Sequence, residues 1–129
     1  MTAAVVLDAS AVLAWLQDEP GAGEVEPHLQ DGFVSAVNWS EILQKVAQRG
    51  RDPRQTGALL RALGLVIVPV TQEDAEEAAA TLWPQANPAG LSLADRCCLA
   101  LARRLDATIL TADKAWADLT IDLAITLVR

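Results

Sequence analysis

The chain has 129 residues, a net charge of −7 at pH 7 and 52% hydrophobic residues. This length predicts one domain, spanning residues 1–129, with a single ordinary core. The negative charge argues against a protein that coats nucleic acid non-specifically. The mean hydropathy of +0.24 is high for a small domain and favours a partner or a second copy of the chain. Alanine, which does not make a sticky surface, accounts for much of this apolar excess.

The cysteines and the hydropathy profile indicate where the protein resides. Cys97 and Cys98 are adjacent in a predicted helix, where they cannot form an ordinary disulfide. They are expected to be buried thiols in a reducing compartment. The N-terminus does not resemble a signal peptide, and no apolar run reaches the ~20 residues that span a bilayer. We therefore expect a cytoplasmic protein with no membrane association.

In the first half of the chain, a valine-rich apolar run is followed by amphipathic segments with clear helix boundaries. Pro53 suits the first turn of a helix, and Gly64 suits the position just after its end. Gly50 similarly ends the preceding helix. The expected elements are a strand at 4–7, a helix at 10–17, a short helix near 24–30, a strand at 33–35, and helices at 38–49 and 53–63.

The second half continues the alternation of strands and helices. Pro69 near the end of a valine-rich run indicates an edge strand. Thr71 and Asp74 have the spacing of a capping box. The expected elements are a strand at 66–70, a helix at 72–83, a loop at 84–90, a helix at 92–105, a strand at 108–110, a short helix at 113–118 and a strand at 123–127. Such alternation predicts an α/β fold with a mainly parallel sheet covered on both faces.

Four acidic residues occur where predicted strands end or helices begin: Asp8, Glu41, Asp95 and Asp113. In parallel sheets, ligands bind at the carboxyl ends of strands. Asp8 directly follows the first predicted strand, and Asp113 follows the strand at 108–110 by a few residues. Carboxylates repel one another, so their convergence suggests a hard divalent cation. Mg²⁺ and Mn²⁺ prefer oxygen ligands and activate water for attack on phosphate. The pattern predicts metal-dependent phosphodiester chemistry.

Each acid also has a purely structural interpretation. Asn38 and Ser92 are the expected N-caps of their helices, so that Glu41 and Asp95 occupy the third helical position of a capping box. The two acids that follow strands could be ordinary turn residues. Capping and metal binding are compatible, because the helix dipole favours an ionised acid at this position.

Two hydroxyl residues accompany the aspartates in the sequences DAS and TAD. Ser10 and Thr111 could orient a carboxylate or a metal-bound water. The alternative is that they only cap local backbone groups.

A basic segment between residues 45 and 64 contains five cations and only one acid, for a local charge of +4. It could follow the phosphates of an RNA strand, or it could be two solvated helix faces. The possible RNA contacts are Lys45, Arg49, Arg51 and Arg54.

Five segments together resemble a PIN-domain protein, and more specifically the VapC-type toxins of toxin–antitoxin pairs. They are VLDASAVLAWL, AVNWSEIL, LGLVIVPV, LSLADRCCLALARRL and ATILTADKAW, which cover nearly the whole chain in order. The resemblance implies a three-layer α/β/α sandwich and Mg²⁺- or Mn²⁺-dependent endoribonuclease activity. It assigns the acidic quartet to Asp8, Glu41, Asp95 and Asp113, with Ser10 and Thr111 as supporting hydroxyls, and it leaves Asp118 as a surface residue.

The resemblance also implies partners. Such proteins form homodimers and are silenced by a cognate antitoxin whose tail occupies the acidic site. DNA binding belongs to the antitoxin, and nothing in this chain resembles a DNA-reading motif. The RNA target is not predicted by the sequence.

Two other functions compete with this interpretation. A phosphoryl-transfer domain could use Asp8 as nucleophile. The haloacid-dehalogenase-like enzymes, however, have a second aspartate where this chain has Ser10. A catalytically silent PIN-like module could instead use its acids only to dock a basic partner peptide.

Overall fold

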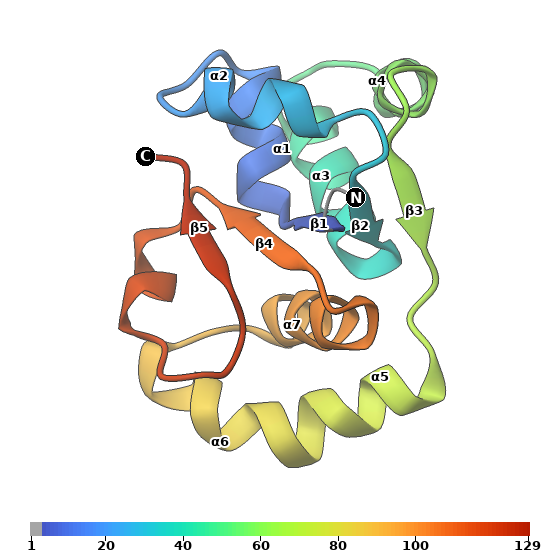
Figure 1. Cartoon of the computed structure of the whole chain (residues 1–129). Coiled ribbons are helices and arrows are strands. Elements are labelled where there is room, and N and C mark those ends of the chain that lie inside the picture. Colours follow the sequence, from blue (N-terminus) through green and yellow to red (C-terminus); the bar gives the residue numbers. More distant parts are fainter. Residues whose placement is uncertain (1–3) are drawn as a thin grey trace.

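The computed structural model describes residues 4–129 and has a central five-stranded sheet (Figure 1). The strand order is β3–β2–β1–β4–β5, and all four neighbouring pairs are parallel. The strands are β1 (Val5–Leu7), β2 (Phe33–Ser35), β3 (Val66–Val68), β4 (Thr108–Thr111) and β5 (Ile125–Leu127). The predicted α/β fold with a parallel sheet is therefore confirmed, and β3 is an edge strand as Pro69 indicated.

The central strand β1 separates two hydrophobic cores. Val6 and Leu7 are both fully buried, and because successive side chains of a strand point to opposite faces, they enter different cores. Leu7 packs with apolar residues of α1 (Ala9–Leu16), α3 (Ala36–Gln48) and α4 (Pro53–Ala62). Val6 packs with residues of α6 (Trp83–Ala86) and α7 (Leu93–Leu105). The molecule is thus a three-layer sandwich.

The smaller helices complete the two outer layers (Figure 1). α2 (Ala22–Val25) and the 3₁₀ turn Glu26–His28 lie on the side of α1, and α5 (Gln72–Glu77) lies with α6 and α7 on the opposite side. The 3₁₀ helix Lys114–Asp118 occurs between β4 and β5 where a short helix was expected. Among residues 4–129, no helix has the length and apolar character needed to cross a bilayer.

One predicted loop is wrong. Residues 84–90 were expected to be irregular, but α5 runs through a π-helical turn (Ala78–Leu82) into α6 and then a 3₁₀ turn (Asn87–Ala89). Pro84 is accommodated because it lies in the first turn of α6, where its missing N–H is not needed. The guanidinium of Arg96 donates to the carbonyl of Ala78 over 2.8 Å and supports the turn.

Candidate active site

Several of the predicted site residues lie at the carboxyl end of the parallel sheet. Asp8 follows β1 directly, and its backbone N–H donates to the carbonyl of Leu110 on β4 over 3.1 Å. The neighbouring pair Leu7 and Leu110 is in register, so the next residues, Asp8 and Thr111, lie side by side. Ser35 ends β2 on the other side of β1 and begins α3. Three adjacent strands therefore deliver polar side chains to one edge.

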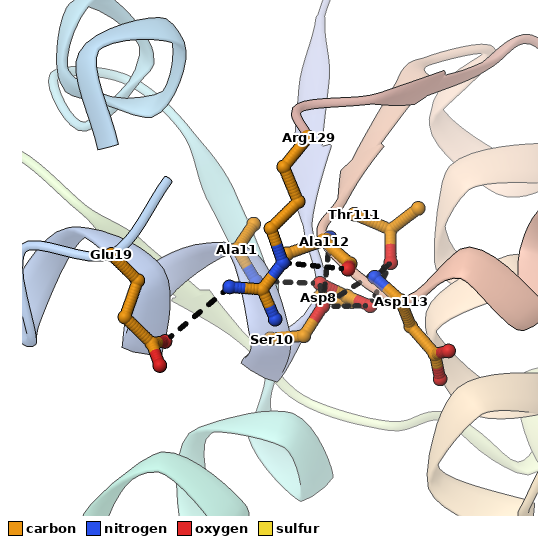
Figure 2. A network of polar contacts seen from close by, with 8 residues as sticks. All are labelled: Asp8, Ser10, Ala11, Glu19, Thr111, Ala112, Asp113 and Arg129. Carbon is orange, nitrogen blue, oxygen red and sulfur yellow. Dashed lines mark hydrogen bonds and ion pairs between the residues drawn. The ribbon is translucent and has the colours of Figure 1, made fainter. Parts of the chain in front are cut away.

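Asp8 is the centre of a hydrogen-bond network (Figure 2). Its Oδ1 accepts from the backbone N–H of Ala11 over 2.9 Å, which makes Asp8 the N-cap of α1. The Ser10 hydroxyl lies 2.7 and 2.9 Å from the two carboxylate oxygens, and the Thr111 hydroxyl donates to Oδ2 over 2.5 Å. The Ser10 oxygen in turn accepts from the N–H of Ala112. Both predicted hydroxyl residues thus fix the orientation of this carboxylate.

The buried position of Asp8 makes its negative charge costly. Only 2% of the residue is exposed, and burial raises the pKa of Asp8 from 3.8 to about 6. Hydrogen bonds from Thr111, Ala11 and Ser10 lower this pKa, whereas the nearby charge of Asp95 raises it. The difference corresponds to roughly 3 kcal/mol that opposes the charged form. No ion pair within residues 4–129 involves Asp8, so an added cation would relieve this cost.

Glu41 is hydrogen-bonded by Asn38, which the sequence analysis wrongly assigned as the N-cap of its helix. The N-cap of α3 is Ser35, whose hydroxyl accepts from the N–H of Asn38 over 3.2 Å, because β2 runs into the helix without a loop. Asn38 is therefore not the cap, and Glu41 lies in the second turn outside any capping box. The fully buried Asn38 donates through Nδ2 to Glu41 Oε1 over 2.9 Å and to the carbonyl of Ala94 over 3.4 Å.

Asp95 occupies the capping box that the sequence predicted. Ser92 is the N-cap of α7, and its hydroxyl accepts from the N–H of Asp95 over 3.2 Å. Asp95 Oδ2 accepts from the N–H of Ser92 over 3.0 Å. The side chain is half-buried, so it contacts both the helix terminus and the solvent at the edge of the sheet.

Three of the acids lie near the start of α7, where Asn38 donates both to Glu41 and to the carbonyl of Ala94, the residue before Asp95. Cys98 is a fully buried free thiol of α7. Burial raises its pKa well above the ordinary value, and the charges of Asp8, Asp95 and Glu41 raise it further, in that order. All three carboxylates thus act on the same buried side chain of α7. Asp8, Glu41 and Asp95 therefore form one acidic rim, carried by β1, α3 and α7.

Asp113 lies at the same edge but faces elsewhere. Its backbone N–H donates to the Thr111 hydroxyl over 3.1 Å, which ties it to the Asp8 network. Its exposed carboxylate accepts from the N–H of Ala115 and, in Figure 2, points away from Asp8.

The acidic side chains are not gathered as a preformed cage. Across residues 4–129, no three His, Cys, Asp or Glu side chains are placed to hold one ion. The physical reason is local, because Asp95 and Asp113 each cap a helix terminus. Binding one ion with all four acids would require these two carboxylates to turn from backbone N–H groups toward the metal.

The basic segment extends away from the rim along α3 and α4. Lys45 lies one helical turn beyond Glu41. All four predicted RNA-contact residues of the basic segment are exposed. Arg49 and Arg51 line a pocket of about 300 Å³ between the end of α3 and the start of α4. Asp118 is also exposed, in agreement with its expected place on the surface.

These features define a parallel three-layer α/β domain with an acidic rim at the carboxyl ends of its central strands. The PIN domain family model matches residues 5–121. The chain belongs to the PIN domain family. No curated protein matches the chain.

Solved structures of similar fold include several toxin–antitoxin complexes. A chain of a toxin–antitoxin complex from Klebsiella pneumoniae is 18% identical, with a TM-score of 0.74 and 98% of each chain covered. A chain of the DNA-bound VapBC structure from Salmonella typhimurium is 11% identical, with a TM-score of 0.71, 99% of this chain and 100% of that chain covered. A chain of VapBC-1 from nontypeable Haemophilus influenzae is 16% identical, with a TM-score of 0.69, 96% of this chain and 97% of that chain covered. At these identities, the likeness establishes the fold.

Proposed function

We propose that the protein is a metal-dependent endoribonuclease and the toxin component of a toxin–antitoxin pair. The observation that carries the proposal is the buried carboxylate of Asp8, flanked by the charges of Asp95 and Glu41 and oriented by two hydroxyls. A protein that only needed a helix cap would not benefit from two further acids beside a buried one. Membership of the PIN family and the toxin–antitoxin relatives support the same function.

The donor set suits Mg²⁺ or Mn²⁺. The ligands would be Asp8, Glu41, Asp95 and Asp113, all of which offer carboxylate oxygens, the donors that these hard cations prefer. When bound, the ion supplies an activated water and stabilises the charge that develops on phosphate. Thr111 and Ser10 hold the Asp8 carboxylate in place, and Asn38 holds Glu41. These contacts fix two of the ligands before any ion arrives.

RNA would approach the rim along the basic segment. Arg49, the C-cap of α3, is eight residues beyond Glu41, or about 12 Å along the helix axis. Lys45, Arg49, Arg51 and Arg54, which are all exposed, would contact phosphates on one side of the cleavage point. Contacts to the backbone supply affinity without sequence preference.

The partners follow from the same surface chemistry. A basic antitoxin residue could enter the acidic rim through an Arg–carboxylate pair, and DNA would be bound only by the antitoxin. Exposed apolar side chains would serve the antitoxin or a homodimer. They are Leu59, Leu63, Val66, Trp83 and Leu93.

The test compares the wild-type chain with Asp95→Asn on total RNA in Mg²⁺ or Mn²⁺, followed by mapping of the cleaved ends. We expect the wild type to cut RNA, excess EDTA to stop it, and Asp95→Asn to lose activity while keeping its fold. Asp118→Asn, an exposed acid in a 3₁₀ helix, is the matched control and should retain activity.

The same experiment separates a nuclease from a docking module. One observation favours a docking module: the carboxylates of Asp95 and Asp113 accept hydrogen bonds from backbone N–H groups and are not placed to hold one ion together. It predicts a chain that is inert on every RNA, harmless when expressed and indifferent to Glu41→Gln. Toxicity that disappears with Glu41→Gln would support the nuclease, and full cleavage in EDTA would exclude the metal mechanism.

A further inference from the structure

A cavity of about 740 Å³ opens beside Asp8 on the side of β4 and β5. Its volume lies within the ~300–1,000 Å³ range of small-molecule sites. Ser10 and Asp113 line its border with the acidic rim, and two cations, Lys114 and Arg129, line it as well. The basic segment discussed above belongs to α3 and α4, on the other side of β1. The two cations of the cavity therefore form a second positively charged group next to the same site, separate from the basic segment.

Arg129 is held in a defined position in this cavity (Figure 2). Its Nε donates to the carbonyl of Ala112 over 3.2 Å, and its Nη1 lies 3.6 Å from Glu19 Oε1. The preceding residue, Val128, is buried and donates its N–H to the carbonyl of Thr111 over 2.9 Å. The backbone that carries Arg129 is thus anchored to the strand that supports Asp8. One third of the side chain remains exposed and available to a ligand.

The sheet order sets the distance from the site. β5 is two strands from β1, which corresponds to about 10 Å across the sheet. An RNA strand bound at Asp8 can therefore contact Arg129 with an adjacent part of its backbone. Asp113 lines the same cavity, and under the proposed function the metal ion would offset its negative charge.

We propose that Arg129 and Lys114 bind a backbone phosphate of the RNA strand that is cut at the acidic rim. The inference rests on the proposed ribonuclease function and adds a substrate contact on the side of the rim opposite the basic segment. A guanidinium fixed at one edge by a carbonyl can present its remaining N–H groups to phosphate, and Lys114 adds a mobile point charge. Glu19 competes with the phosphate for Arg129.

The experiment measures binding of a fluorescein-labelled single-stranded RNA of mixed sequence in Mg²⁺ at several salt concentrations. All chains carry Asp95→Asn so that the RNA remains intact. Arg129→Gln should weaken binding roughly tenfold and reduce the slope of log K against log salt by about 0.7, the value for one phosphate contact on a single strand. Arg129→Lys should restore the slope, and Lys114→Gln should reduce it by part of this amount, because both side chains contact the same phosphate.

Two further variants sharpen the test. Glu19→Gln removes the competing carboxylate, so RNA should bind more tightly than to the parent chain. Arg103→Gln removes a cation from the last turn of α7, at the opposite end of that helix from Asp95, and should leave both affinity and slope unchanged. Mn²⁺ affinity, followed by electron paramagnetic resonance in chains that retain Asp95, should not fall in Arg129→Gln, because that residue lies outside the acidic rim.

The outcomes separate this inference from the proposed function. An unchanged slope in both Arg129→Gln and Lys114→Gln, while the wild-type chain still cleaves RNA, overturns only the inference. A wild-type chain that neither binds nor cleaves RNA overturns both. If Arg129→Gln unfolds at a lower temperature than the parent, the decision rests on Lys114→Gln and Glu19→Gln, whose expected effects have opposite signs.

Discussion

The hydroxyl of Thr111 donates to Oδ2 of Asp8 over 2.5 Å, across the junction of β4 and β1. Thr111 is fully buried, and its oxygen also accepts from the N–H of Asp113. One hydroxyl thus couples two of the four acids. Its loss would leave a buried carboxylate oxygen with one donor fewer, which makes this contact the sharpest test of how the site is supported.

Thr111→Val keeps the shape of the side chain and removes the hydroxyl. We expect the free energy of unfolding to fall by about 1–3 kcal/mol, because a buried acceptor and a backbone donor lose their partner. Cleavage activity should fall as well, since Asp8 is no longer held. Thr111→Ser should restore most of both properties. Urea denaturation and RNA cleavage measure the two effects, and a valine variant with wild-type activity would contradict the positioning role.

The raised pKa of Asp8 predicts how the stability of the metal-free protein depends on pH. Its folded-state pKa of about 6 exceeds the unfolded value of 3.8, so this contribution to stability is complete below 3.8 and is lost as pH rises through 6. In EDTA, Asp8→Asn should therefore stabilise the protein at pH 7.5 by up to roughly 3 kcal/mol, and by roughly half as much at pH 5. The amide oxygen of asparagine can still accept a hydrogen bond from the N–H of Ala11.

Those measurements should stay above about pH 4.5 because another acid has the opposite dependence. Burial opposes the charge of Asp74, but hydrogen bonds from Arg104 and Thr71 lower its pKa overall. Its contribution to stability is present above the unfolded value and is lost as pH falls below it. Urea midpoints at pH 5 and 7.5 isolate Asp8. Equal effects of Asp8→Asn at both values would show that its charge is not costly.

Asn38→Asp tests the support of Glu41. The new side chain can still accept from the Ser35 hydroxyl, but it cannot donate to Glu41 and it adds a negative charge beside that residue. We expect lower stability without metal and a large loss of cleavage activity. Asn87→Asp, at an exposed 3₁₀ turn, is the matched control and should change neither property. Normal cleavage by Asn38→Asp would show that Glu41 needs no such support.

Two adjacent arginines on α7 provide a test of the fold apart from the site. Arg104 makes two hydrogen bonds to the buried Asp74, whereas Arg103 pairs with the more exposed Glu77. Arg104→Gln should destabilise the protein by about 1–3 kcal/mol, and Arg103→Gln by less than about 1 kcal/mol. Neither should change the metal dependence of cleavage. Thermal unfolding provides the comparison, and equal losses would contradict the importance of burial.

Elements with strong local signals were predictable from the sequence. The strand at 33–35 and the capping boxes of Thr71 and Ser92 occur as expected, because each depends on residues within a few positions. The continuation of the helix through Pro84 was not predictable, since the guanidinium of Arg96 supports the preceding π-helical turn from another helix. Local propensity carries no information about that contact.

The candidate site was predictable in its location but not in its internal contacts. The alternation of strands and helices placed the acids at one edge of the sheet. The true cap, Ser35, was missed because β2 passes into α3 without a loop, and Asn38 was consequently assigned the wrong role. Arg129 carried no recognisable motif, and its place beside Asp8 depends on the pairing of β5 with β4.

The contact between Asp8 and Thr111 joins residues 103 positions apart in the chain. During synthesis, Asp8 therefore remains an ordinary hydrated carboxylate until β4 has been made and has paired with β1. A shift of that pairing by one residue would turn Thr111 to the opposite face of the sheet. The geometry of the acidic rim thus reports on completed, in-register folding, and we expect unfinished or misfolded chains to be harmless to the cell that makes them.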